Sequence, residues 1–347
     1  MRKFIIGLFV ILVLFIICGC SQQNIITEEK TDVITDGIGR NIEITVPLTR
    51  VVVANTYNTE LINAIGAIDT VVGVDYAIYQ DEEGYKGRFK MENIIGKSQR
   101  ELNYERIIEL APQALILTGN GSWQEAEEKL SPFGIKVIVL DAYYTDRFFD
   151  NCKLLGALFG KKREAEELSS YFKEKLDYIK TNLSNTELKS VYFEYRREGN
   201  TTVPGDYFYN MVKYAGGKNI FEDAVNVSVD SESIIERNPQ CIVKVGENNV
   251  SSSYIPPTET EFIKRMKEIK NRPGWDSIDA VKNNKILLLS HFCHGGGSKL
   301  VGTMYIAKFM YPELLPELNP EEVFKVWLEK YQGLKYISGH TYPAFGL

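Results

Sequence analysis

The sequence predicts an α/β protein with two similar lobes, and three observations lead to this fold class. Predicted strands and helices alternate along most of the chain, which is the pattern of parallel sheets covered by helices. One segment, 103–116, recurs 127 positions later as 230–243, with six of its fourteen positions identical. A long helical segment at about 146–183 lies between the two copies. A repeat with this wide spacing indicates two lobes of similar build, and ligands often bind in the cleft between lobes.

The start of the chain predicts a targeting segment. Two basic residues precede the apolar run 4–17, which leads into Ile-Cys-Gly-Cys, ending at Cys20. This is the pattern of a secretory signal, and its last four residues resemble a lipobox. We expect residues 1–19 to be removed, Cys20 to carry lipid, and 20–32 to form a flexible tether. The alternatives are a plain signal peptide or an uncleaved anchor helix, although the run is short for a membrane span.

The N-terminal lobe is expected to begin with a hairpin, because the turn at 36–40 joins two short alternating segments. Short apolar runs then predict buried strands, and apolar residues at helical spacing predict the helices between them. The predicted strands are 50–53, 70–74, 114–117 and 136–140, and the predicted helices are 59–65, the start of the first repeat copy, and 123–133.

The segment 146–183 keeps its apolar residues at helical spacing, with an interruption near Gly160. Its place midway between the two repeat copies makes it the expected link between the lobes. In the C-terminal lobe, the predicted strands are 190–195, the end of the second repeat copy, and 285–289, and the predicted helices are 207–214, the start of that copy, 260–267, 302–310 and 320–332.

Charge and cysteine content exclude several classes of protein. The net charge of −6 and the lack of a basic run argue against a nucleic-acid binder. After Cys20, the cysteines are Cys152, Cys241 and Cys293, an odd number at scattered positions, which does not indicate a disulfide framework. We expect Cys152 and Cys241 to be buried free thiols.

Several segments, read in order along the chain, carry a family resemblance. They are 50–53 (Arg-Val-Val-Val) after the hairpin, 60–67, 71–74 (Val-Val-Gly-Val), 96–112 with Glu-Arg-Ile-Ile-Glu-Leu-Ala-Pro at its end, and 214–220 (Tyr-Ala-Gly-Gly-Lys-Asn-Ile). From about residue 33 to residue 332, the chain resembles the substrate-binding lipoproteins of ATP-binding-cassette (ABC) importers for iron-siderophores and cobalamin. The order of these segments, rather than any one of them, makes the resemblance specific.

The resemblance implies an architecture and a set of partners. Two Rossmann-like α/β lobes, 33–147 and 186–347, would be joined by a single long rigid helix at 148–185, with the ligand cleft between the lobes. The implied partners are an ABC permease with its ATPase, a small-molecule metal chelate, and the membrane through the lipid anchor. We expect a monomer with no intrinsic cofactor, whose ligand is an iron chelate or a corrinoid.

Glu105 and Glu232 occupy matching positions in the two repeat copies. In the resembled family, one surface glutamate on each lobe docks into arginines of the permease, and these two residues stand where that pattern places them. Asn103 and Asp230 are good N-caps, so each glutamate falls in a first helical turn. The alternative is that both carboxylates only stabilise the helix starts through the helix dipole.

Ligand contacts in the resembled family come from loops that follow the strands and face the cleft. The candidate loops are rich in aromatic and basic side chains, which suit a flat organic ligand with acidic groups. The candidate ligand-binding residues are Tyr57, Tyr76, Trp123, Tyr143, Tyr195, Arg196, Arg197, Tyr207, His291 and His294. Since Arg196 and Arg197 follow a strand end, only one of them is expected to face the cleft.

The segment 291–297, His-Phe-Cys-His-Gly-Gly-Gly, holds two of the three histidines of the chain. His291 and His294 are candidate metal ligands, since neutral imidazole is the commonest protein ligand for transition metals. The alternative is a Gly-rich loop whose histidines hydrogen-bond a ligand or a neighbour. His340 follows the last predicted helix, and we expect no role for it.

We therefore expect an extracytoplasmic substrate-binding protein that captures a ferric siderophore or related iron complex and delivers it to a permease. Cobalamin or haem as the cargo, or a bare metal ion held by His291 and His294, are the alternatives. A membrane-anchored α/β hydrolase is less favoured, because the chain has no Gly-x-Ser-x-Gly elbow. It also has no phosphate-binding Gly-x-x-x-x-Gly-Lys-Ser/Thr loop, so we expect that this chain is not itself the ATPase. The expected function is binding, with no enzymatic activity.

Overall fold

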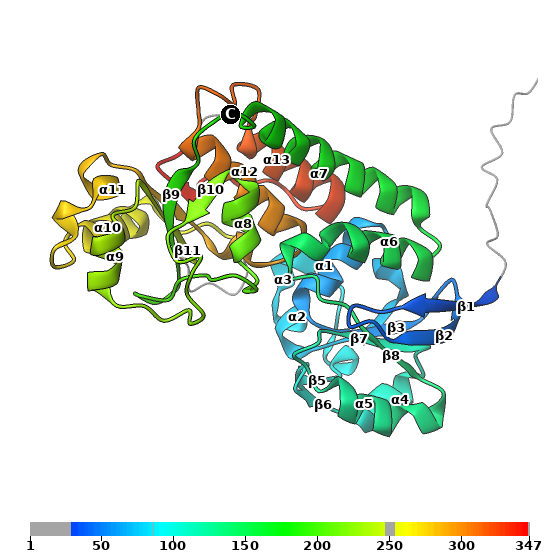
Figure 1. Ribbon diagram of the computed structural model, residues 1–347. Helices are drawn as coiled ribbons and strands as arrows, with labels where there is room; N and C mark the ends of the chain where they lie inside the picture. Colours follow the sequence, from blue (N-terminus) through cyan, green and yellow to red (C-terminus); the bar gives the residue numbers. More distant parts are fainter. Residues whose placement is uncertain (1–28, 86, 247–253, 346–347) are drawn as a thin grey trace, which may run out of the picture.

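The computed structural model describes residues 29–85, 87–246 and 254–345, which form two α/β lobes (Figure 1). The expected signal segment and Cys20 lie outside the described residues. Within the described ranges, no helix has both the length and the apolar character that a membrane crossing requires.

The N-terminal lobe is built on a parallel sheet in the order β4-β3-β7-β8. Its central strands are buried along their whole length, as expected for a parallel sheet covered on both faces. The strands of this lobe are the hairpin pair β1 (Lys30–Thr35) and β2 (Asn41–Val46), then β3 (Val51–Ala54), β4 (Val71–Val74), β5 (Gly96–Ser98), β6 (Glu101–Leu102), β7 (Ala114–Leu117) and β8 (Lys136–Val139). Its helices are α1 (Thr56–Ala64), α2 (Tyr76–Gln80), α3 (Glu82–Tyr85), α4 (Tyr104–Leu110) and α5 (Trp123–Leu130).

The C-terminal lobe has a sheet in the order β10-β9-β11-β12-β13, parallel except for β13, which pairs antiparallel with β12. β13 was not predicted from the sequence. The strands are β9 (Lys189–Tyr195), β10 (Gly217–Asn219), β11 (Cys241–Val245), β12 (Ile286–Leu289) and β13 (Thr341–Tyr342). The helices are α8 (Tyr209–Tyr214), α9 (Ser231–Arg237), α10 (Glu259–Lys270), α11 (Asp279–Lys282), α12 (Gly296–Met310) and α13 (Pro320–Val326), which continues into a π-helical turn, Trp327–Gln332.

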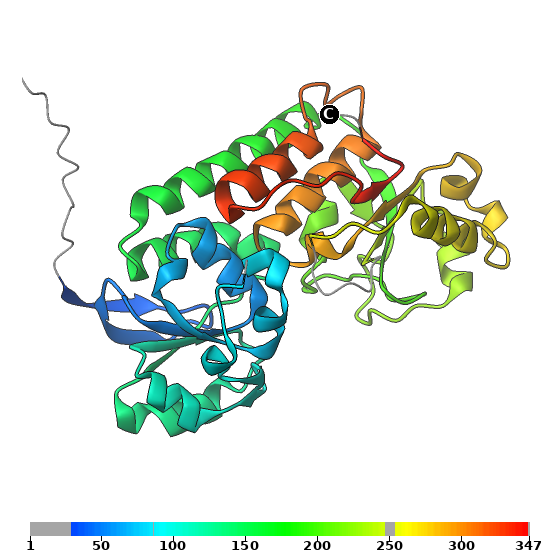
Figure 2. The same cartoon turned by 180° about the vertical axis from the view of Figure 1, so that it is seen from behind.

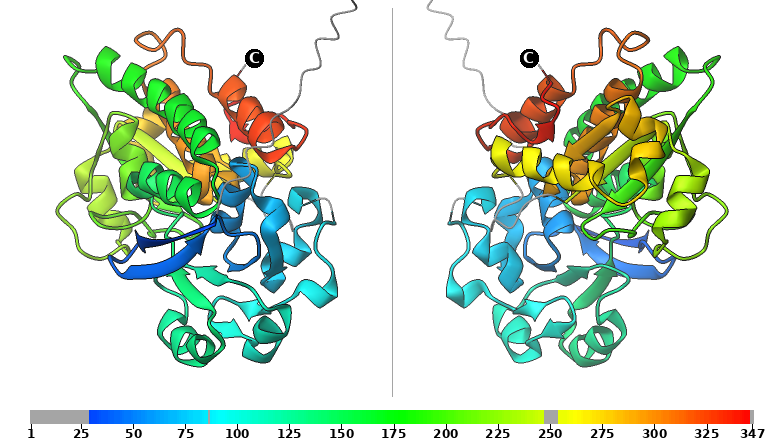
Figure 3. Two further views of the ribbon diagram at one scale, coloured as in Figure 1. Left: turned by 90° about the vertical axis from the view of Figure 1, so that its right-hand side faces the viewer. Right: turned by 90° about the vertical axis from the view of Figure 1, so that its left-hand side faces the viewer.

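The link between the lobes consists of two helices, α6 (Phe148–Leu158) and α7 (Lys162–Asn182), where a single helix at 148–185 was expected. The chain breaks at Gly160, whose φ of +66° ends α6. The two helices pack on each other, with the rings of Phe148 and Phe172 at 5.2 Å. The longer helix, α7, spans from the N-terminal to the C-terminal lobe and runs alongside α13 (Figures 2 and 3). There Phe172 contacts Trp327 at 5.8 Å.

The two copies of the sequence repeat form the same local structure. Asn103 accepts a hydrogen bond from the backbone N–H of Arg106 at 3.0 Å, and Asp230 accepts one from that of Ser233 at 2.8 Å. Both predicted N-caps are therefore confirmed, and α4 and α9 begin where they place them. Each helix ends in a residue with left-handed backbone, directly before the repeated proline.

The repeated glutamine also has one role in both lobes. The side-chain oxygen of Gln113 accepts hydrogen bonds from the backbone N–H groups of Thr49 and Arg50, just before β3. Gln240 accepts one from the N–H of Ser190 in β9 at 2.9 Å. In each lobe the glutamine thus ties the strand after the repeated helix to the start of the neighbouring strand.

The expected state of the cysteines is confirmed for the described part of the chain. Cys152, Cys241 and Cys293 are buried free thiols. Burial raises the pKa of the Cys152 thiol to about 12 and that of Cys241 to about 11. All three side chains therefore pack in the cores as neutral, largely apolar groups.

Candidate functional site

His294 stands at the centre of a group of aromatic side chains where the two lobes meet. Its ring stacks on that of Tyr57, with centroids 5.1 Å apart and 21° between the planes. The rings of Tyr195, Tyr207 and Phe208 lie 5.1, 5.6 and 5.4 Å from it. Tyr57 comes from α1 of the N-terminal lobe and the other rings from the C-terminal lobe. These five residues, the His294 cluster, therefore join the lobes.

The start of α1 positions Tyr57. Asn55 caps this helix, because its side-chain oxygen accepts hydrogen bonds from the N–H groups of Tyr57 at 3.0 Å and Asn58 at 3.3 Å. Gly295 packs directly against the Tyr57 ring, and a Cβ at that position would collide with the ring. The C-terminal lobe can approach α1 this closely because residue 295 has no side chain.

The contact with Arg196 determines the tautomer of His291. The Nη2 atom of Arg196 lies 3.3 Å from Nε2 of His291. A guanidinium group only donates hydrogen bonds, so Nε2 is the acceptor and the ring proton is on Nδ1. Burial, together with Arg196, lowers the pKa of His291 to about 4, so the ring is neutral at pH 7. Among the described residues, Arg196 and not Arg197 reaches the histidines.

The other titratable groups of the cluster are also neutral. The hydroxyl of Tyr195 and Nδ1 of His294 are 2.7 Å apart. Burial, with His291 nearby, lowers the pKa of His294 well below its ordinary value. Burial raises the pKa of Tyr57 and of Tyr195, so both hydroxyls keep their protons. At neutral pH the site therefore offers apolar ring faces, hydroxyl groups and the cation of Arg196.

Lys299 is a second cation at the lobe junction, and it was not predicted from the sequence. Its side chain is fully buried. Its ammonium group donates to the carbonyl oxygen of Tyr143 in the N-terminal lobe and to that of Tyr207, at 2.9 Å, in the C-terminal lobe. It also lies over the rings of Tyr207 and Phe208, at 4.8 and 4.6 Å. Burial lowers the pKa of Lys299 to about 7. The signal in the sequence was a lysine inside an apolar helix.

Glu60 of α1 is the buried acid of the same junction and was also missed. Its carboxylate accepts hydrogen bonds from the hydroxyls of Tyr254 at 2.6 Å and Ser298 at 2.5 Å. The indole N–H of Trp327 donates to the Ser298 hydroxyl at 2.9 Å. The backbone of Gly296 packs on the carboxylate, so a Cβ at 296 would collide with it. Burial raises the pKa of Glu60 to about 7.

Glu60→Gln is expected to stabilise the protein at pH 8 and to change its stability little at pH 5. The folded-state pKa of Glu60, about 7, lies above the ordinary value of 4.5. The stability that this group contributes is therefore fully present below pH 4.5 and is lost as the pH rises through 7. A shift of this size corresponds to a gain on the order of 3 kcal/mol for the amide at pH 8.

Urea unfolding at pH 5 and pH 8 measures this pH dependence. Glu236→Gln, at an exposed carboxylate of α9, controls for the loss of one charge. Equal effects of Glu60→Gln at the two pH values would show that Glu60 does not titrate in this range.

The structure brings together most of the predicted ligand residues, but not all of them. Tyr143 joins the His294 cluster through an edge contact with Tyr207 at 5.9 Å. Tyr76 is exposed and contacts the ring of Tyr79. The ring of Trp123 is covered by the guanidinium of Arg40 at 4.5 Å. In the described ranges Tyr57, Tyr143, Tyr195, Arg196, Tyr207, His291 and His294 form the gathered set, and Tyr76, Trp123 and Arg197 lie outside it.

Metal ligation by His291 and His294 stays a prediction. The two rings are 4.8 Å apart. Among the described residues, no group of three or more histidine, cysteine, aspartate or glutamate side chains is arranged to hold a metal ion. The thiol of Cys293 donates to the carbonyl oxygen of Ser290 at 3.5 Å and packs against Gly302, so it belongs to the core.

His340 is not incidental, contrary to the expectation from the sequence. It is buried, and its Nδ1 lies 2.7 Å from the hydroxyl of Ser290. Its ring contacts Phe292 at 5.3 Å and Phe324 at 5.0 Å. His340 therefore supports the loop that carries the two site histidines. The role of His340 could not be predicted from the sequence, because it depends on the pairing of β13 with β12, which brings the C-terminal segment to this loop.

The repeated glutamates lie away from this cluster. Glu105 and Glu232 are exposed, each in the first turn of its helix. Their helices, α4 and α9, lie on the side of the molecule away from α7 (Figures 1 and 2). Glu109, one turn further along α4, forms an ion pair with Arg106 at 2.8 Å, so the two glutamates of that helix differ in their contacts.

Comparisons with known proteins agree with this architecture. The chain is 26% identical over 318 residues to a Bacillus subtilis protein named as an uncharacterized ABC transporter substrate-binding lipoprotein, YvrC, covering 86% of this chain and 94% of that protein. It is 24% identical over 231 residues to a vitamin B12-binding protein of Yersinia pestis, covering 64% of this chain and 80% of that protein.

A solved structure shows the same fold. The crystal structure of a TroA-like periplasmic binding protein, FepB, from Veillonella parvula superposes with a TM-score of 0.72 at 21% identity. The superposition covers 89% of this chain and 98% of that one. A family model described as periplasmic binding protein matches residues 51–291, which include parts of both lobes. The chain belongs to the periplasmic binding protein family.

Proposed function

We propose that the protein is the extracytoplasmic substrate-binding component of an ABC importer, and that its cargo is a ferric siderophore or related iron complex. The His294 cluster is the observation that carries this proposal. It places ring faces from both lobes beside the cation of Arg196, where a flat chelate with acidic groups would find complementary surfaces. The names of the relatives agree with this class of protein, and the proposal includes no catalytic step.

Titration of the purified protein with ferric siderophores, cobalamin and haem tests the proposal. Tyrosine and tryptophan fluorescence reports binding, and metal analysis of the untreated protein runs alongside. Sub-micromolar quenching by a ferric siderophore, with little metal in the untreated protein, is the expected result. Tight binding of cobalamin alone would show that the cargo is cobalamin, as the name of the B12-binding relative suggests for that protein.

Direct binding of a metal ion is the second candidate, because His291 and His294 lie beside each other in the cluster. Each histidine already has one ring nitrogen in contact with a protein group, Arg196 or Tyr195. A metal would therefore have to use the remaining nitrogens or displace these partners. Stoichiometric metal in the purified protein, lost in the double variant His291→Ala, His294→Ala, would favour this candidate.

Glu105 and Glu232 are proposed to dock onto the permease. The double variant Glu105→Ala, Glu232→Ala is expected to keep its ligand affinity and to lose stimulation of the partner ATPase. Both carboxylates are exposed and far from the cluster, so their loss should not disturb the ligand site. A carboxylate in each lobe suits bidentate pairing with arginines of the partner.

ATPase assays with the permease complex measure this effect. The matched control is the double variant Glu109→Ala, Glu236→Ala, which removes the same charges one turn further along the same helices. Full stimulation by the Glu105, Glu232 double variant would rule out the proposed docking role.

We also propose that Cys20 carries the lipid that holds the protein at the membrane. Fatty-acid labelling of cells should mark the wild-type protein. The label should be absent from Cys20→Ala, and equal labelling of both would contradict the proposal.

A further inference from the structure

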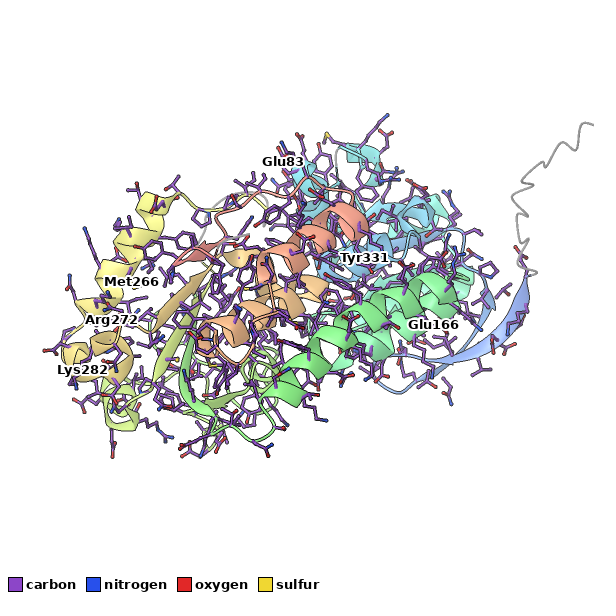
Figure 4. The ribbon with its side chains drawn as sticks, turned by 90° about the horizontal axis from the view of Figure 1, so that it is seen from above. Glu83, Glu166, Met266, Arg272, Lys282 and Tyr331 are labelled. Carbon is purple, nitrogen blue, oxygen red and sulfur yellow. The ribbon has the colours of Figure 1, made fainter. Side chains whose placement is uncertain are left out.

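We propose that a buried ion cluster, formed by Glu194, Lys244 and Arg272, positions Arg196 to bind an anionic group of the ligand. This inference rests on the proposed function, because it assigns Arg196 to the ligand site, and it adds a requirement for negative charge on the ligand. The cluster lies in the C-terminal lobe behind the turn that follows β9, and Figure 4 shows Arg272 at the α10 end of this lobe.

Arg196 has an unusual backbone conformation. Its φ is +55°, in the left-handed region that costs an L residue free energy unless its surroundings enforce it. Two hydrogen bonds hold it there. Its N–H donates to the carbonyl oxygen of Val245 at 3.0 Å. Its own carbonyl oxygen accepts from the ammonium group of Lys244 at 2.6 Å. Lys244 therefore fixes the peptide group from which the Arg196 side chain turns toward His291.

Glu194 fixes Lys244 in turn. The side chains of Glu194 and Lys244 are each 1% exposed, and their charged atoms lie 2.9 Å apart. Arg272, 9% exposed, donates to both oxygens of Glu194, at 2.8 and 2.9 Å. Glu194 also accepts from the hydroxyl of Tyr192 at 2.8 Å and from the N–H of Gly199 at 3.0 Å. The Glu194 carboxylate thus holds Lys244 and, through Gly199, also the end of the turn that follows β9.

Stability alone does not explain such a cluster. Buried ion pairs often contribute no more to stability than apolar groups of the same size, because desolvation offsets their attraction. This one brings together two cations and one buried carboxylate. A further acidic side chain, that of Glu198, lies 3.3 Å from Nε of Arg272 but is largely exposed. What the cluster supplies is a fixed geometry for the turn, together with a positive potential behind Arg196.

The guanidinium of Arg196 is available to a ligand. Arg196 is exposed, and its guanidinium contacts the nitrogen of His291 and the ring of Tyr195, at 5.1 Å, while its Cγ lies beside Gly246. In the part of the chain that the structure describes, no carboxylate lies within 4.0 Å of it. Among the described residues Arg196 is thus held in place, next to neutral histidines, without an anionic partner, which suits it to a carboxylate or catecholate of the ligand.

Titrations with two probes test the inference: an anionic ferric tris-catecholate and a neutral ferric tris-hydroxamate, each followed by fluorescence quenching. Lys244→Met is expected to weaken binding of the anionic probe about tenfold and that of the neutral probe less than about threefold. Lys264→Met, at an exposed lysine of α10, removes the same charge from the surface and should leave both affinities unchanged.

Two further variants separate positioning from folding. Arg196→Gly suits the positive φ, so it should keep the melting temperature while losing the preference for the anionic probe. In an Arg196→Ala background, Lys244→Met should have no additional effect on binding, because its action passes through Arg196. A purely structural role of Lys244 would give the same loss of binding in both backgrounds, which would overturn the inference. A Lys244→Met variant that is too unstable to bind either probe would likewise show a structural role and overturn the inference.

The outcomes separate this inference from the proposed function. If the wild-type protein binds only the neutral probe or cobalamin, the importer function stands and the requirement for an anion fails. If the wild-type protein binds no chelate, both fail together. Retention of the anionic preference by Arg196→Gly overturns the inference alone.

Discussion

Gly296→Ala is expected to lower the free energy of unfolding by about 3 kcal/mol, although it adds a single methyl group. Gly296 has a φ of +57°, a left-handed conformation that costs an L residue about 1–2 kcal/mol. A Cβ there also collides with the Glu60 carboxylate, which Tyr254 and Ser298 hold by hydrogen bonds. Overpacking of a buried site typically costs about 1–3 kcal/mol. Urea unfolding followed by tryptophan fluorescence measures the loss.

Gly205→Ala is the matched control for this prediction. Gly205 has a φ of +88°, so alanine meets the same backbone penalty, but nothing lies within 4 Å of the position that its Cβ would take. We expect a loss of about 1 kcal/mol there. The difference between the two variants isolates the contact between the lobes at Gly296. Equal losses would show that the junction yields to accommodate the methyl group.

The repeat shows what the sequence could predict. The N-caps, the glutamates and the proline stops are local features, and their spacing places two short helices and two buried strands correctly. The role of the repeated glutamine could not be predicted, because Gln113 and Gln240 accept hydrogen bonds from backbone groups 63 and 50 positions away. An N-cap residue bonds to residues next to it in the sequence, whereas the hydrogen bonds of the glutamines depend on which strands become neighbours.

The link between the lobes shows a different limit. Apolar residues keep helical spacing on both sides of Gly160, so periodicity alone predicts one long helix. The two helices instead separate at Gly160, whose φ is +66°, and pack on each other through Phe148 and Phe172, a contact that periodicity does not report. The limits that we place on the lobes, 33–147 and 186–347, stay predictions.

The buried charges at the junction were beyond sequence reasoning for a related reason. A lysine and a glutamate on helices normally indicate solvent-exposed faces. Lys299 is buried because Tyr143, 156 positions earlier, covers it from the other lobe. Glu60 is buried because Ser298 and Tyr254 of the other lobe close over it. The tyrosines and histidines of the site could be named as candidates because their chemistry stood out in the sequence, whereas Phe208 was not predicted. Trp123 shows that the same signal also selects a residue that packs elsewhere.

His294→Ala is expected to weaken binding of the ferric chelate on the order of a hundredfold, which corresponds to about 2.7 kcal/mol. The imidazole stacks on Tyr57 of one lobe and contacts Tyr195 and Tyr207 of the other, so its removal separates the ring faces that the ligand would use. The Tyr195 hydroxyl also loses its partner. Fluorescence titration with the chelate that the wild-type protein binds measures the effect.

His340→Ala separates loss of the site from loss of stability. His340 is buried behind the same loop, with ring contacts to Phe292 and Phe324, so its removal should cost about 3 kcal/mol of stability. Its affinity for the chelate should stay within about threefold of the wild-type value, because its ring does not touch the His294 cluster. An equal loss of affinity in the two variants would mean that His294 acts only by holding the loop.

His294→Phe then distinguishes the two ways in which the imidazole would serve a ligand. Phenylalanine keeps the ring and its contacts with both lobes but lacks Nδ1, so it costs the hydrogen bond between Tyr195 and residue 294, about 1 kcal/mol. If the ring face is what the ligand needs, affinity falls by roughly tenfold or less. If a nitrogen of His294 coordinates a metal, phenylalanine is as damaging as alanine, because neither side chain has a donor atom. The ratio of the two variants' affinities therefore decides between chelate capture by stacking and direct ligation.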